Sequence, residues 1–156
     1  MIIKEMEKED FFKIRNNLKD YWGERYKLFE QMHQPLFFYE FGKTAYIIKE
    51  SNEIAGYLLG LLPQTSRSAY VHMIAVKEKF QNHNYGKLLY EHFISFSKSQ
   101  GYKKIKAVTS PSNINSIRFH KKIGMKLIGN KNREGIPVVN NYSGVGDDRV
   151  IFEKDI

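Results

Sequence analysis

The sequence contains no cysteine. That absence excludes disulfide bonds, thiolate metal sites and a cysteine nucleophile. The chain also lacks any apolar run near the length that crosses a bilayer. Residues 1–7 have neither the basic segment nor the long apolar stretch of a signal peptide. We therefore expect a cytoplasmic protein with no membrane partner.

The remaining composition favours one globular domain over residues 1–156. Hydrophobic residues make up 42% of the chain and aromatic residues 14%, which is enough to bury a core without covalent cross-links. We find no linker, internal repeat or low-complexity segment that would divide the chain.

The chain is basic, with a net charge of +8. Its lysines are dispersed, apart from small groups at residues 103–106 and 121–122. Dispersed charge is typical of a solvated surface, although part of it can attract an anionic ligand. A basic nucleic-acid-binding domain is a further hypothesis, but no nucleic-acid motif is present, so we expect no nucleic-acid partner.

Hydrophobic periodicity predicts alternating helices and strands. Before the centre of the chain it indicates a strand at 2–5, helices at 8–21 and 24–33, and strands at 43–50, 53–61 and 68–76. Ser51 and Asn52 suit a tight hairpin between two of these strands. After the centre we expect a helix at 84–100, a strand at 105–109, a helix at 113–123, strands at 136–140 and 148–153, and a flexible loop at 140–148.

These elements predict an α/β (α+β) fold. Its sheet is mixed, mostly antiparallel and twisted, with roughly six to seven strands and helices on both faces. The helix at 84–100 can serve as the crossover between two parallel strands, 68–76 and 103–109. A ligand site is expected where the ends of those neighbouring strands separate.

The segment 73–87 carries the strongest functional signal, because an apolar strand runs through a polar turn into an amphipathic helix. The first turn of a helix presents unpaired backbone N–H groups and partial positive charge, which suit a phosphate. Gly86 permits close approach to the backbone, and Lys87 adds a cation. The alternative is an ordinary junction that binds nothing.

This segment resembles motif A of the GNAT superfamily of N-acetyltransferases. Ile74, Ala75 and Val76 form the strand end, and residues 81–86 form the turn, with Asn84 in place of the family's first Gly. Asn tolerates a positive φ better than other residues that carry a side chain. Residues 110–125 resemble motif B: Asn113, Ser116, Gly124 and Met125 match, and His120 takes the place of the usual Tyr.

The resemblance implies a GNAT-like fold with acyl-CoA held in a V-shaped gap between strands 68–76 and 103–109. The implied cofactor-binding residues are Ile74, Ala75, Val76, Gln81, Asn82, His83, Asn84, Tyr85, Gly86, Lys87, Asn113, Ser116 and Phe119. The implied activity is transfer of an acetyl group from acetyl-CoA, a co-substrate, to a primary amine of a small molecule or peptide. The alternative is a catalytically silent GNAT-fold module that binds acyl-CoA or a partner. The sequence leaves open whether the protein forms a homodimer.

Two histidines are the candidate catalytic residues, and direct transfer to an amine needs no metal. His72, on one face with Tyr70, Ile74 and Val76 by strand alternation, can act as general base where the family often has Glu. It can equally be a polar residue of the pocket wall. His120 can supply the proton that the family's Tyr gives to the CoA sulfur, or it can simply pack within the fold.

Other polar and aromatic residues have two readings each. Asn113 either caps its helix or hydrogen-bonds the pantetheine arm of CoA. Asp147 and Asp148 attract a cationic amine or only solvate their loop, where Arg149 can pair with them. An aromatic-rich segment belongs either to the core or to the acceptor pocket. Its members are Tyr21, Trp22, Arg25, Tyr26, Phe37, Phe38 and Tyr39.

Overall fold

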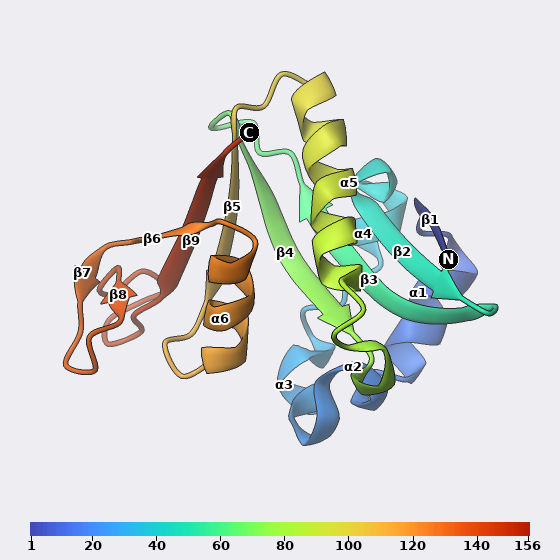
Figure 1. The fold of residues 1–156 in the computed structure, drawn as a ribbon, viewed down its shortest axis with the longest axis horizontal. Helices are drawn as coiled ribbons and strands as arrows, with labels where there is room; N and C mark the ends of the chain where they lie inside the picture. The colour runs from blue at the N-terminus through green and yellow to red at the C-terminus, as the bar shows by residue number, and fades with distance from the viewer.

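Seven strands form one mixed sheet in the computed structural model, which describes all residues 1–156 (Figure 1). In sheet order they are β1 (Ile2–Glu5), β2 (Ala45–Glu50), β3 (Glu53–Leu61), β4 (Ser68–Val76), β5 (Lys104–Thr109), β9 (Val150–Asp155) and β6 (Lys126–Ile128). Only β4 and β5 are parallel, and every other neighbouring pair is antiparallel. The predicted fold class is confirmed.

Helices cover both faces of the sheet. Two helices, α5 (Tyr85–Ser99) and α6 (Ile114–Lys122), lie on the face nearest the viewer in Figure 1. The opposite face carries α1 (Lys8–Asn16), α2 (Lys19–Trp22), α3 (Tyr26–Glu30) and α4 (Leu36–Tyr39). The 3₁₀ turns are η1 (Gly23–Arg25), η2 (Gly42–Thr44) and η3 (Glu78–Phe80). None of the helices combines the length and hydrophobicity needed to cross a membrane.

Each face of the sheet has its own hydrophobic core. Leu58, Leu89 and Phe93 belong to the cluster beneath α5 and α6, whereas Phe11 and Tyr57 belong to the cluster beneath α1 to α4. Strand β3 is buried along nearly its whole length because it lies between the two cores. Its side chains therefore read as a continuous apolar run rather than an alternating one.

The N-terminal helices are shorter than predicted. Helix 8–21 is interrupted at Asn17, which leaves helical geometry and donates a side-chain hydrogen bond of 2.8 Å to the carbonyl of Lys13. Such side-chain bonds compete with the regular ladder. Helix 24–33 is replaced by η1 and α3. The predicted hairpin is confirmed, since Ser51 and Asn52 both have positive φ.

The C-terminal prediction is wrong in two places. The segment 136–140 does not join the main sheet: only β8 (Pro137–Val138) is a strand, and it pairs with β7 (Asn130–Lys131) in a separate hairpin. The missing sheet member is β6, which pairs with β9. The loop at 140–148 is tied by side chains, because Asp148 accepts bonds from Asn140 and from the amide of Asn141.

Candidate active site

The parallel strands β4 and β5 separate partway along their length. Pairing begins at Ser68 and Lys104, ends at Val71 and Ala107, and leaves the rest of β4 to diverge from β5. Figure 1 shows the two strands moving apart toward the end of β4 that leads into α5. The structure therefore contains the V-shaped separation that the resemblance implies.

A β-bulge in β4 reverses the predicted alternation of side chains between the two faces of the sheet. It lies at the point where β4 separates from β5. Leu59 is the partner of Met73 while Gly60 is the partner of Val71, so the intervening His72 is an extra residue in β4. Val71 packs in the core beneath α5, whereas Met73 packs in the opposite core. After the bulge, each side chain lies on the opposite face of the sheet from the one that simple alternation predicts. The expectation that His72 shares a face with Ile74 and Val76 is therefore wrong.

His72 lies on the α1–α4 side of the sheet. Its ring stacks on Phe37 with 4.8 Å between centroids, and its Nε2 lies 3.3 Å from the carbonyl of Met32. A carbonyl can only accept, so Nε2 carries the proton and Nδ1 keeps its lone pair. Burial lowers the pKa of His72 below its usual 6.5. A neutral imidazole with a free lone pair can accept a proton at neutral pH.

The turn between β4 and α5 presents a run of unpaired backbone amides. The N–H of Gln81 bonds to Glu78 and that of Leu88 bonds to Asn84, but none of the amides of residues 82–87 donates within the protein. Asn82 and Asn84 have φ values of 66° and 61°. The positive φ predicted for Asn84 is therefore confirmed. Asn84 forms no side-chain cap. Such a nest of amides at a helix start suits an anion.

The side chains of this turn contribute unequally. Tyr85 is buried and donates 2.8 Å to Glu50, so its side chain faces away from the turn and only its amide can serve a ligand. Gln81 donates 3.3 Å to the carbonyl of Val76, and His83 bonds the carbonyl of Gln81 at 2.9 Å. Lys87 is exposed and lies 3.6 Å from Glu91.

Gly86 has a side-chain neighbour that the sequence did not predict. A Cβ at this position would lie 3.0 Å from the ring of Phe119, so the glycine makes room for that ring against the first turn of α5. The expected close approach of a ligand to the Gly86 backbone stays a prediction, and the Phe119 ring gives a second reason for a glycine here. Phe119 thereby links motif B to the amide turn.

Asn113 caps α6. Its Oδ1 accepts from the amide of Ser116 at 3.3 Å, and its Nδ2 donates to Thr109 Oγ1 at 3.1 Å. Of the two predicted roles, the capping role is therefore the one that the structure contains. The bond to Thr109 also fixes the start of α6 against the end of β5.

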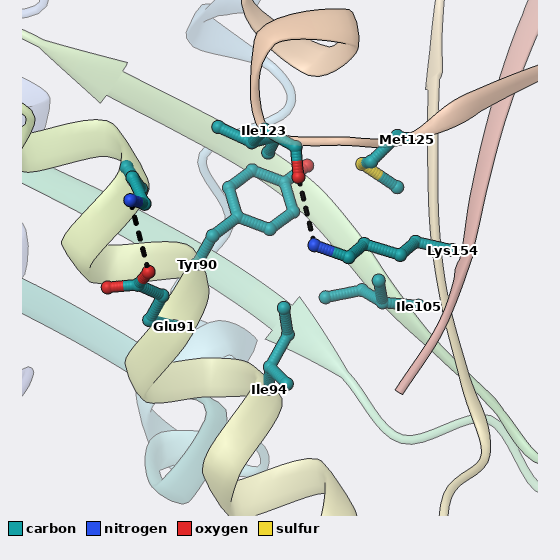
Figure 2. A pocket seen from close by; sticks show the side chains of 8 residues that line it. Tyr90, Glu91, Ile94, Ile105, Ile123, Met125 and Lys154 are labelled. Atoms are coloured by element: carbon teal, nitrogen blue, oxygen red, sulfur yellow. Dashed lines mark hydrogen bonds and ion pairs between the residues drawn. The ribbon is translucent and has the colours of Figure 1, made fainter.

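A small cavity of about 50 Å³ lies between α5, the end of α6 and β5 (Figure 2). It is lined by Lys87, Tyr90, Glu91, Ile94, Ile105, Ile123, Met125 and Lys154. Lys154 closes one side by donating 2.9 Å to the carbonyl of Ile123, at the end of α6. A cavity of this size holds water but no CoA arm, so the candidate site is the amide turn with the strand separation.

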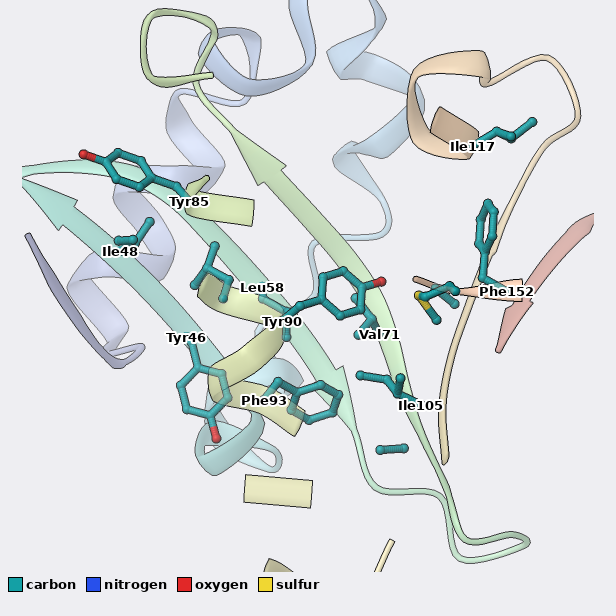
Figure 3. Packing of buried hydrophobic residues seen from close by; sticks show 14 of the residues in the cluster. Tyr46, Ile48, Leu58, Val71, Tyr85, Tyr90, Phe93, Ile105, Ile117 and Phe152 are labelled. Carbon is teal, nitrogen blue, oxygen red and sulfur yellow. The ribbon is translucent and has the colours of Figure 1, made fainter. Parts of the chain in front are cut away.

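His120 is buried, with 4% of its surface exposed. Its Nδ1–H donates to the carbonyl of Ser116 at 2.7 Å, and its Nε2 accepts from the hydroxyl of Tyr90 at 2.7 Å. Its ring stacks on Phe152 at 4.2 Å. Figure 3 shows the Tyr90 ring reaching from α5 toward the strands.

Burial lowers the pKa of His120 to about 4, which keeps the ring neutral at pH 7. Both of its nitrogens are engaged. The predicted imidazolium proton donor is therefore wrong for the resting structure. Its place in the fold is that of an acceptor that fixes the hydroxyl of Tyr90.

The aromatic segment and the two aspartates of the late loop mostly make contacts that stabilise the fold. Tyr21 and Phe37 are buried, and Trp22 donates 2.7 Å to Tyr57, so the aromatic segment belongs largely to the core. Asp147 pairs with Arg149 at 2.8 Å. With Asp148 bound to its own loop, neither carboxylate is free to attract an amine.

Sequence reasoning missed a buried network under the α1–α4 face. Tyr57 donates 2.6 Å to Nε2 of His33, whose Nδ1 donates 2.7 Å to the carbonyl of Phe29. This network and the Tyr90–His120 pair share one pattern, since each histidine bonds the carbonyl four residues earlier. That spacing was visible in the sequence, but the tyrosine partners come from distant segments.

Comparisons with known proteins agree with this geometry. A family model described as the acetyltransferase (GNAT) family matches residues 8–125. No curated protein sequence matches the chain significantly. A GNAT-family acetyltransferase structure from Desulfovibrio desulfuricans shares 16% identity with a TM-score of 0.75, covering 99% of this chain and 98% of that one.

Two further solved structures show the same fold. The ribosomal-protein-S18-alanine N-acetyltransferase of Escherichia coli has 18% identity and a TM-score of 0.69, covering 99% of this chain and 93% of its own. An aminoglycoside 6′-N-acetyltransferase complexed with coenzyme A has 14% identity and a TM-score of 0.70, covering 99% and 97%. Since the family model spans most of the sequence, this chain belongs to the GNAT family of acetyltransferases.

Proposed function

We propose that this protein transfers an acetyl group from acetyl-CoA directly to a primary amine. One observation carries the proposal: the six unpaired amides of residues 82–87 follow the part of β4 that has left β5, with only residues 77–81 between them. An anion site and the separation of the two strands thus lie next to each other. A CoA molecule combines a pyrophosphate with a long thin arm, and it fits that combination.

The donor is held mainly by backbone. The amides of Asn82 to Lys87 bind the pyrophosphate, and the unpaired edge of β4 at Ile74, Ala75 and Val76 accompanies the pantetheine arm. Phe119 and Ser116 on α6 close the side of this path, with Asn113 fixing the start of that helix. Gln81 and His83 shape the turn through their own backbone contacts.

The donor supplies a thioester, whose carbonyl carbon accepts the amine nitrogen. A C–N bond forms, the C–S bond breaks, and one proton moves in net from the amine to the departing sulfur. His72, neutral with a free Nδ1, takes the proton of the amine. The hydroxyl of Tyr90 takes the place of the family's tyrosine as donor to the thiolate, and to do so its O–H has to turn from Nε2 of His120 toward the sulfur.

A second candidate function is a silent module that binds acyl-CoA without turnover. The buried, neutral His120 at the position of the family's tyrosine favours it. Both candidates require acetyl-CoA binding, and only the enzyme requires CoA release.

Two measurements test the proposal in order. Titration calorimetry with acetyl-CoA comes first, and no binding would contradict both candidates. Release of the CoA thiol is then followed across a panel of amino acids, peptides, polyamines and aminoglycosides. Amine-dependent thiol release supports the enzyme, whereas binding with no release by any amine supports the silent module.

A further inference from the structure

A row of polar and aromatic side chains crosses the sheet next to the strand separation, on the face opposite α5 and α6. Tyr70 of β4 and Lys106 of β5 are cross-strand partners, one step before the last pair at Val71 and Ala107. Val71 and Ala107 pack beneath α5, so their neighbours Tyr70 and Lys106 project from the other face.

Two further residues extend this row. The Nζ of Lys106 lies 5.3 Å from the ring centre of Tyr142, which reaches over from the loop before β9. On the other side, the ring of Tyr70 lies 6.4 Å from that of His72. We call Tyr70, His72, Lys106 and Tyr142 the back-face row. Its members flank the point where β4 leaves β5.

Lys106 is the one cation of the row, and it forms no ion pair with a carboxylate. Glu153 stands opposite it on β9 but lies 3.6 Å from Lys104 instead. Asp147 of the Tyr142 loop is bound to Arg149. Lys106 forms neither an ion pair nor a hydrogen bond, although its side chain is partly buried.

The acceptor amine has to arrive from this side. Helices α5 and α6 cover the other face, where Phe119 and Tyr90 fill the space above the strands. The members of the back-face row are then the side chains nearest to a thioester in the strand separation on the face away from α5 and α6. An incoming amine therefore passes the ammonium group of Lys106.

We propose that the acceptor is a primary amine that also carries a carboxylate, bound by the ammonium of Lys106 between the rings of Tyr70 and Tyr142. This inference rests on the proposed acetyltransferase function and names its substrate class. The carboxylate supplies the missing counter-ion of Lys106 in a partly desolvated position. Polycationic acceptors, such as aminoglycosides and polyamines, meet the ammonium of Lys106, and the nearby carboxylates Glu153 and Asp147 are already paired with Lys104 and Arg149.

Matched acceptor pairs test the substrate class. L-phenylalanine with L-phenylalaninamide, and glycylglycine with its amide, differ only in the carboxylate. Amidation also lowers the pKa of the neighbouring amine and leaves more of it neutral, so intrinsic reactivity favours the amide. We expect kcat/KM for thiol release to be at least about tenfold higher for the carboxylates. Equal values, or faster reaction of spermidine or kanamycin, would overturn the inference.

The variants Lys106→Met and Lys104→Met locate the effect. Both remove one charge from the same face of β5, but Lys104 stands farther from the strand separation. Lys106→Met should raise KM for the carboxylate acceptor about tenfold and leave acetyl-CoA affinity unchanged. Lys104→Met frees Glu153 to pair with Lys106, so it should raise that KM by less and also leave acetyl-CoA affinity unchanged. An unaltered KM in Lys106→Met overturns the assignment of Lys106.

The failure of this inference is distinguishable from failure of the proposed function. Absence of acetyl-CoA binding in calorimetry removes both. Binding of acetyl-CoA together with release of its thiol by amines other than the carboxylates removes only the substrate class. Binding without release by any carboxylate amine also overturns the substrate class, and leaves the CoA site standing.

Discussion

The hydroxyl of Tyr90 on α5 donates a 2.7 Å hydrogen bond to Nε2 of His120 on α6. Tyr90 has 1% of its surface exposed and His120 has 4%, so this bond joins the two helices inside the core. The pair stands at the motif position that suggested a catalytic histidine. The histidine at that position accepts a hydrogen bond and holds the hydroxyl of Tyr90 in place, whereas the sequence predicted a proton donor.

Breaking this pair should destabilise the protein. His120→Phe leaves the Tyr90 hydroxyl buried without a partner, which should lower the free energy of unfolding by about 1–3 kcal/mol. Tyr90→Phe should have a similar effect, and the double variant should lose less than the sum. Urea unfolding of the four proteins measures the coupling, and strictly additive losses would contradict a direct interaction.

The same variants separate structure from chemistry. If Tyr90 delivers the proton, Tyr90→Phe should lower kcat at least tenfold while acetyl-CoA affinity is retained, since general acid catalysis contributes about a hundredfold or more. His120→Gln can still accept from Tyr90 and should keep more activity than His120→Phe. A wild-type kcat in Tyr90→Phe would leave proton delivery to water.

Stability should fall on mild acidification. The folded-state pKa of His120 is about 4, below its usual 6.5, so between these values the unfolded chain binds a proton that the folded chain does not. The free energy of unfolding is therefore highest above pH 6.5 and falls toward pH 4, by about 3 kcal/mol from His120 alone. Burial lowers the pKa values of His33 and His72 as well, and these act in the same direction.

Urea unfolding between pH 7.5 and 4.5 measures this dependence. His120→Phe removes one titrating group, so its stability should change less with pH than that of the wild type across this interval. Parallel curves for the two proteins would show that His120 is not the origin of the acid sensitivity.

Asn84 should be replaceable by Gly and not by Ala. Its φ of 61° lies in the left-handed region, where Gly is free of strain and Ala is not. Its side chain makes no cap, so Asn84→Gly removes no hydrogen bond of the helix start. We expect Asn84→Ala to lose about 1 kcal/mol in urea unfolding and Asn84→Gly to stay near the wild type. Equal losses would contradict this explanation.

The sequence predicted well whatever depends on local pattern. The hairpin at Ser51 and Asn52, the helix start at Asn84 and the cap at Asn113 each follow from a few adjacent residues. The prediction failed where contacts between segments far apart in the sequence determine the local structure. The bulge at His72 depends on the register with β3, and the short strand β6 exists because β9 offers it an edge.

The candidate site shows the same division. The amide turn could be located from residues 81–87 because helix ends bind anions through the backbone. The neutral state of His120 could not be predicted from the sequence, because it results from its contacts with Tyr90 and Phe152 and from burial in the core around them. Likewise the back-face row depends on a loop that brings Tyr142 over Lys106.

Gly86 and Phe119 should behave as a coupled pair. A Cβ at residue 86 would meet the Phe119 ring at 3.0 Å, so Gly86→Val displaces that ring and should weaken acetyl-CoA binding at least about tenfold. Adding Phe119→Ala to Gly86→Val removes the clash and should restore part of the affinity. Calorimetry on the three variants tests this. No recovery in the double variant would show that the side chain obstructs the ligand itself.

The central claim is that the backbone amides of residues 82–87 bind the pyrophosphate of CoA, and ¹⁵N-resolved NMR of those amides tests it most directly. Acetyl-CoA should shift the signals of Asn82 to Lys87 more than those of amides elsewhere in α5. S-acetylpantetheine, which lacks the pyrophosphate, should leave them nearly unmoved while shifting signals of β4. If acetyl-CoA binds and the amides of residues 82–87 keep their positions, the anion site and the function built on it are contradicted.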